Sequence, residues 1–106
     1  MTAKVRVPSN SVALGGWKGR LEFAEDVIRV LGDDPTKCLE IDPAAVKRCS
    51  FNSNNGLWAF RMKDGKKVHL QTSGIILSAD RSAEGKAATA RIGALLAKHN
   101  IPGFSI

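Results

Sequence analysis

The chain has 106 residues, enough for one modest hydrophobic core but not for a second folded unit, so we expect a single domain over residues 1–106. Hydrophobic residues make up 43% of the chain and charged residues 25%, a globular composition, and no apolar run approaches the roughly 20 residues of a membrane-spanning helix. The formal net charge of +6 is uneven, with −1 over residues 1–42 and +7 over residues 43–106. A basic C-terminal portion is typical of proteins that bind polyanions, most often nucleic acid, although it also occurs as a plain solvated face.

The N-terminal residues and the cysteines both indicate a cytoplasmic protein. Residues 1–6 carry charges with no apolar segment behind them, so a secretory signal is not expected. Cys38 and Cys49 match no spacing of metal-ligand pairs, and a reducing compartment would keep both as thiols. We expect both thiols to be buried and inert.

In the first third of the chain, residues 4–14 are predicted to form two short extended pieces around a turn. Residues 15–19 contain three glycines and are expected to form a connector, because they lack the pattern of a phosphate-binding loop. Apolar residues at helical spacing then predict a helix over residues 21–31, which Gly32 ends. The apolar positions of this helix are Leu21, Ala24, Val27, Ile28 and Leu31.

Beyond this helix we expect a short strand over residues 38–41 and a single helical turn that Asp42 caps. Period-two alternation then predicts three strands, around Phe51 and over residues 57–62 and 67–72. A last helix is expected over residues 83–99, with Ser82 as its cap and one apolar stripe. The fold class is therefore predicted as α+β, a small antiparallel sheet of three or more strands packed against a C-terminal helix, with a second helix in the N-terminal part. The stripe consists of Ala88, Ile92, Leu95 and Leu96.

The turn after residue 62 decides which side chains of the hairpin share a face. A two-residue turn at Asp64-Gly65 would mix polar and apolar side chains on both faces. A three-residue loop over residues 63–65, with Gly65 in the left-handed conformation, separates them and pairs Arg61 with Lys67. The face toward the helix then carries Phe51, Trp58, Phe60, Val68 and Leu70.

The opposite face is predicted to be polar and basic, and like charges paired across strands destabilise a sheet unless an anion relieves them. Side chains of these types are also the donors that contact phosphates and base edges. An ordinary solvated face is the alternative interpretation. The outward face also carries Ser50 and Ala59, and the candidate nucleic-acid-binding residues are Arg48, Asn52, Arg61, Lys63, Lys66, Lys67, His69 and Gln71.

Residues 49–98 resemble the arm-type DNA-binding domains of phage tyrosine integrases. The matching features are Asn54-Asn55-Gly56, an aromatic strand with Phe60-Arg61, and an alanine-rich helix after Asp80-Arg81. The resemblance implies a three-stranded sheet backed by one helix, with the open face in the major groove of DNA. The first 45 residues have no counterpart in that family, and no recombinase domain follows, which implies a stand-alone binder.

Catalysis is not expected, and neither is a cofactor. His69 and His99 lack the spacing of a metal site, and no local motif joins a cysteine to a histidine as a nucleophile pair. We therefore expect a small basic DNA-binding protein of a phage or mobile element, with DNA favoured over RNA as the partner. The alternative is a protein-interaction module, such as an inhibitor or assembly factor, that uses a sheet edge or an acidic helix around Glu22, Glu25 and Asp26.

Overall fold

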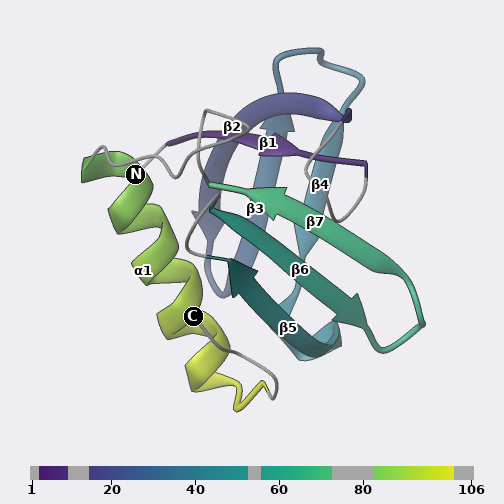
Figure 1. The fold of residues 1–106 in the computed structure, drawn as a ribbon, viewed down its shortest axis with the longest axis vertical. Helices are drawn as coiled ribbons and strands as arrows, with labels where there is room; N and C mark the ends of the chain where they lie inside the picture. The colour runs from purple at the N-terminus through teal and green to yellow at the C-terminus, as the bar shows by residue number, and fades with distance from the viewer. Residues whose placement is uncertain (1–2, 10–14, 53–55, 73–82, 102–106) are drawn as a thin grey trace.

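The computed structural model describes residues 3–9, 15–52, 56–72 and 83–101. Seven antiparallel strands form one sheet in the order β4-β3-β2-β1-β7-β6-β5, and the sheet curls into a half-barrel with helix α1 against its open side (Figure 1). The elements are β1 (Ala3–Val7), β2 (Trp17–Ala24), β3 (Val27–Gly32), β4 (Cys38–Ile41), the 3₁₀ turn η1 (Pro43–Ala45), β5 (Val46–Asn52), β6 (Leu57–Met62), β7 (Lys67–Gln71) and α1 (Ala83–Lys98).

The predicted fold class is wrong, because the sheet is a seven-stranded half-barrel and the described residues contain one α-helix, not two. Residues 21–31, predicted as a helix, form the end of β2, a tight turn and most of β3, with Leu21 paired to Val30. The apolar residues fit helical spacing, but in the structure the buried positions of β3 are Ile28 and Val30, which alternate as in a strand, and Leu31 is exposed. The β-branched residues Val27 and Ile28 favour the strand, and pairing with β1 and β4 on either side completes the sheet.

The connector expected over residues 15–19 is also wrong, because β2 begins at Trp17. Gly19 lies within this strand and pairs with Gly32 of β3. A Cβ atom on Gly19 would lie 2.4 Å from the carbonyl oxygen of Leu31, which is far inside the contact distance. The glycine therefore allows close approach of two backbones and does not provide a flexible link.

Several predicted elements are confirmed. The strand over residues 38–41 is β4, the three later strands are β5, β6 and β7, and the last helix ends one residue earlier than predicted. Asp42 caps η1, since its carboxylate accepts a hydrogen bond from the amide of Ala44 at 3.0 Å. The first extended piece is β1, whereas the second piece, around Val12, and the predicted cap at Ser82 lie outside the described residues.

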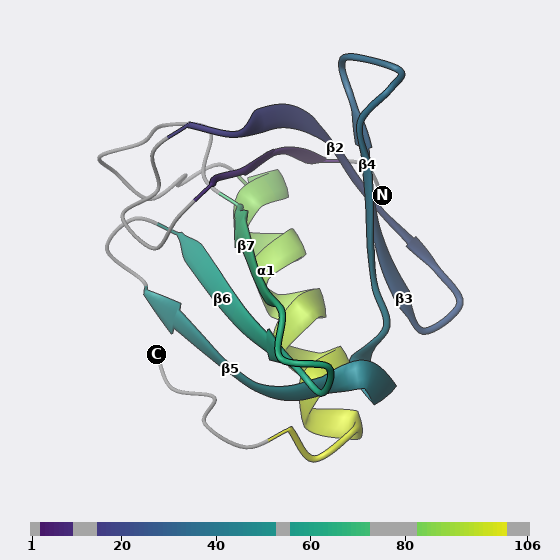
Figure 2. The ribbon, with the colours of Figure 1, turned by 90° about the vertical axis from the view of Figure 1, so that its right-hand side faces the viewer.

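The core lies between the concave face of the half-barrel and α1 (Figure 2). The predicted stripe of α1 faces it, with Ala88, Ile92 and Leu96 fully buried and Leu95 partly buried. Trp58 is fully buried as well. The core residues contributed by the sheet are Val5, Leu21, Ile28, Val30, Ile41, Val46, Cys49, Trp58, Phe60 and Leu70.

Helix α1 is followed by a residue in the left-handed conformation. Asn100 has φ of 55°, and the amide of Ile101 donates to the carbonyl of Leu96 at 3.2 Å. This is the hydrogen-bond pattern in which the residue after the left-handed position folds back on the last turn. Ile101 then packs against the core, which fixes the direction of the chain as it leaves the helix.

The turn between β2 and β3 stores backbone strain at Glu25, which has φ of 57°. Because glycine adopts this conformation without steric cost, Glu25→Gly should raise the free energy of unfolding by about 0.5–1 kcal/mol. Urea unfolding measures the change. Glu25→Ala is the control, since it removes the same charge and keeps the strain, and an equal gain in both variants would assign the effect to charge.

Candidate anion-binding site

The hairpin of β6 and β7 has the predicted turn and register, and this register lines up three cations. The amide of Gly65 donates to the carbonyl of Met62 at 3.0 Å, and Gly65 has φ of 92°. Arg61 therefore lies opposite Lys67 on one side and opposite Arg48 of β5 on the other. We call Arg48, Arg61 and Lys67 the cation row.

A β-bulge at the start of β5 sets the direction of Arg48. The register shifts between Val46 and Arg48, so Lys47 is the extra residue. Both Val46 and Cys49 are buried, although they are three residues apart and strict alternation would place them on opposite faces. The bulge thus turns Arg48 outward beside Arg61 while it keeps Cys49 inward opposite Phe60.

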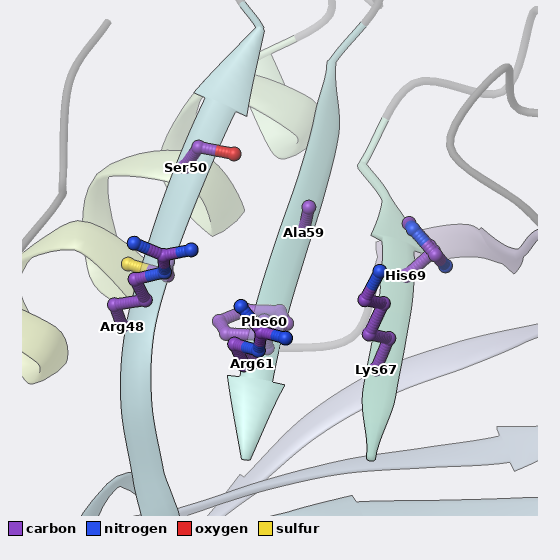
Figure 3. Close-up of a pocket in the computed structure, with 8 residues that line it drawn as sticks. Arg48, Ser50, Ala59, Phe60, Arg61, Lys67 and His69 are labelled. Carbon is purple, nitrogen blue, oxygen red and sulfur yellow. The ribbon is translucent and has the colours of Figure 1, made fainter. Parts of the chain in front are cut away.

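A hollow lies next to the cation row on the outer face of β5, β6 and β7 (Figure 3). Its floor is the next cross-strand row, in which Ser50, Ala59 and His69 lie side by side. Two of these side chains are short, so the surface is recessed between the long cations and the imidazole. We call the hollow together with the cation row that borders it the groove. The groove has a volume of about 450 Å³ and is lined mostly by carbon atoms.

The charges of the two halves of the sheet are arranged in opposite ways. In the half formed by β2, β3 and β4, Arg29 lies between Glu22 and Glu40, at 3.6 and 3.0 Å from their carboxylate oxygens. In the half formed by β5, β6 and β7, the cation row has no carboxylate partner among the residues that the structure describes. The row therefore keeps its full positive charge available to an external anion.

Four of the eight predicted site residues, Arg48, Arg61, Lys67 and His69, line the groove together. Asn52 is exposed one row beyond His69, whereas Lys63 lies in the turn, Lys66 follows it, and neither lines the groove. Ser50 and Ala59 also line the groove. The period-two pattern of the strands placed both on this face, but their short side chains did not mark them as site residues.

The prediction that Gln71 is available at the surface is wrong. Gln71 is fully buried, and its amide oxygen accepts a hydrogen bond at 2.8 Å from the guanidinium of Arg6. Arg6 belongs to β1, which pairs with β7 at this position, and its side chain also donates to the carbonyl of Gly15. The sequence pattern of the hairpin contains no information about a strand that joins it from the other end of the chain.

The acidic helix predicted as the surface for a protein partner does not exist, because Glu22, Glu25 and Asp26 belong to the β2–β3 hairpin. Glu22 pairs with Arg29, and Asp26 pairs with Lys98 at 3.1 Å. Arg91 lies 4.4 Å above the ring of Phe23 beside this ion pair. The Asp26–Lys98 ion pair and the Arg91–Phe23 contact therefore join the hairpin to α1, whereas Glu22 and Arg29 pair within the hairpin.

The two cysteines differ, which corrects the expectation that both are buried. Cys38 is exposed on β4, whereas Cys49 is buried, and burial raises the pKa of its thiol to about 11. We expect a thiol reagent at pH 8 to modify Cys38 rapidly and Cys49 only after unfolding, because the thiolate is the reactive form. Titration in the presence and absence of urea checks this, and rapid modification of two thiols in the native protein would contradict it.

Burial lowers the pKa of His69, and the charge of Lys67 lowers it further. The folded protein therefore binds this proton less readily than the unfolded chain. The stability that depends on neutral His69 should be fully present above pH 6.5, its ordinary pKa, and lost as the pH falls through the lower folded pKa. Urea unfolding from pH 8 to 5 should show a shallower loss for His69→Gln than for the wild type, and parallel curves would contradict the assignment.

Among the described residues, no three side chains of His, Cys, Asp or Glu are grouped as metal ligands would be. No helix in the described part of the chain is long and apolar enough to cross a membrane.

Comparison with known proteins gives a fold relationship. No protein-family model and no curated protein sequence matches the chain. A solved structure with a similar fold is that of Inner Membrane Complex Sub-compartment Protein 3 from Toxoplasma gondii, with a TM-score of 0.56 and 12% sequence identity. The alignment covers 94% of this chain and 76% of that chain. At this identity the similarity concerns the fold alone. The isolated three-stranded sheet that the resemblance to integrase arm-type domains implies does not occur here, because β5, β6 and β7 are part of the larger sheet.

Proposed function

We propose that this domain binds nucleic acid through the groove on the outer face of β5, β6 and β7. The observation that carries the proposal is the cation row, in which three neighbouring strands present Arg48, Arg61 and Lys67 side by side with no carboxylate paired to them in the described part of the chain. With strands about 4.8 Å apart, the row spans about 10 Å. Nucleic-acid phosphates supply the negative charge that such a row needs.

The like charges of the row weaken the sheet of the free protein, and this supports a binding role over a purely structural one. Opposed cations destabilise strand pairing, and the other half of the same sheet places carboxylates on both sides of Arg29. A binding surface explains why the row lacks such partners. The proposal includes no catalytic step, and it places the protein in the cytoplasm, where the exposed thiol of Cys38 would stay reduced.

The acidic helix was one of the two surfaces, with a sheet edge, that the alternative of a protein-interaction module would use. A hairpin stands in its place, and the carboxylates of Glu22 and Asp26 already have cationic partners in the molecule. We therefore prefer the basic groove as the functional surface.

The test is a titration of labelled DNA, both single-stranded and duplex, at two salt concentrations. Arg61→Ala/Lys67→Ala should weaken binding at least about tenfold. The slope of log affinity against log salt concentration should also become shallower by about two, because each lost phosphate contact lowers it by about one. Arg20→Ala/Lys37→Ala is the matched control, since it removes one exposed arginine from β2 and one exposed lysine from the turn before β4, both away from the groove. Absence of binding to both DNAs at low salt, or equal losses in the two double variants, would refute the proposal.

A further inference from the structure

The shape of the groove favours one form of nucleic acid. A protein surface that reads a duplex must project side chains into a groove, because the base edges are recessed there. The centre of this face recedes instead, since Ser50 and Ala59 are short and the cation row rises beside them. A recessed surface suits a group that projects from the ligand, and the bases of a single strand do so.

The chemical character of the hollow, like its shape, suits a nucleobase. The methyl group of Ala59 lies in the middle of the floor, and most of the lining is carbon. The flat imidazole of His69 stands half-buried at one side, and the hydroxyl of Ser50 lies on the opposite strand (Figure 3). A nucleobase has an apolar face that stacks on such a ring and a polar edge that a hydroxyl can meet.

The position of the hollow relative to the charges matches a nucleotide strand. Ala59 and Arg61 are two residues apart on β6 and point to the same face, so the hollow lies about 7 Å from the cation row. The groove volume of about 450 Å³ lies in the range of about 300–1,000 Å³ that is usual for small-molecule sites. An anionic backbone beside an unpaired base would contact both parts at once.

We propose that the ligand is single-stranded nucleic acid, with its phosphates on the cation row and one unpaired base in the hollow over Ala59. This inference rests on the proposed nucleic-acid-binding function and adds the form of the ligand and the site of the base.

The first experiment needs only the wild-type protein. Three labelled ligands of equal length are compared at one low salt concentration: a thymidine strand, the same backbone with abasic sites, and a duplex. The thymidine strand should bind about tenfold more tightly than the abasic strand, because stacking contributes about 1–3 kcal/mol per base. Equal affinity for the thymidine and abasic strands, or a preference for the duplex, would overturn this inference while leaving the proposed function in place. Failure of all three ligands to bind would refute the proposed function itself.

The second experiment places the base in the hollow. Ala59→Leu should fill the hollow. The thymidine strand should then bind no more tightly than the abasic strand, while the affinity for the abasic strand is retained. Ala90→Leu, at an exposed position of α1, is the matched control and should keep the difference in affinity between the two strands. His69→Ala should reduce the difference and His69→Phe, which keeps a flat ring, should restore it. Retention of the full difference in Ala59→Leu would overturn the inference, and urea unfolding of each variant confirms that it is folded.

Discussion

Replacing Arg61 by alanine should stabilise the free protein and at the same time weaken its binding to nucleic acid. Arg61 is the middle member of the cation row and opposes both Arg48 and Lys67. Each opposed pair costs a few tenths of a kcal/mol at these exposed positions, so its removal should raise the free energy of unfolding by about 0.5 kcal/mol at low salt. The gain should shrink at high salt, where surface charges are screened.

The loss of binding should be the larger effect. A charge-assisted hydrogen bond to a phosphate contributes about 1.5–3 kcal/mol, so the affinity should fall about tenfold or more. Arg29→Ala provides the contrast, because Arg29 lies between Glu22 and Glu40 and its removal should destabilise the fold without a change in affinity. Urea unfolding and DNA titration on the two variants test both statements. If Arg61→Ala and Arg29→Ala change stability in the same direction, the cation row does not weaken the sheet in the way proposed.

Trp58→Ala should cause the largest loss of stability of any substitution considered for this protein. The ring is fully buried, and its centroid lies 4.5 Å from that of Phe51 and 6.0 Å from that of Phe60. Truncation of a buried aromatic residue costs about 3–5 kcal/mol, which is a large part of the roughly 5–15 kcal/mol by which a domain is stable. Urea unfolding measures the effect.

The second tryptophan supplies the control for this substitution. Trp17 is only partly buried at the start of β2, so Trp17→Ala should cost clearly less than Trp58→Ala. Comparable losses at the two positions would show that Trp58 is not the centre of the core. Trp58→Phe, which keeps a ring between its two aromatic neighbours, should recover part of the lost stability.

Local chemistry explains what could be predicted from the sequence. The separation of polar from apolar side chains selects a three-residue turn with Gly65 in the left-handed conformation, and the register of this turn places Arg61 opposite Lys67. The exposed face and the apolar stripe of α1 follow from the same kind of regular spacing. Residues 21–31 were predicted wrongly for a physical reason, since their apolar residues fit helical spacing and only the pairing with β1 and β4 shows that they form two strands.

The parts that could not be predicted depend on contacts between distant segments. The bulge at Lys47 is visible only once β5 is paired with β6, and without it Arg48 would face the core. The burial of Gln71 depends on Arg6, which is 65 residues away. The groove itself depends on two short side chains, Ser50 and Ala59, whose importance comes from their neighbours on adjacent strands.

The junction between β1 and β7 has a consequence for how the chain folds. On one side of it, β2, β3 and β4 follow one another as an antiparallel meander, and on the other β5, β6 and β7 do the same. Each meander needs only short loops, whereas the junction joins Arg6 to Gln71 across most of the chain. Closing so long a loop has the highest entropy cost, so we expect the meanders to form early and their union through β1 to limit the folding rate.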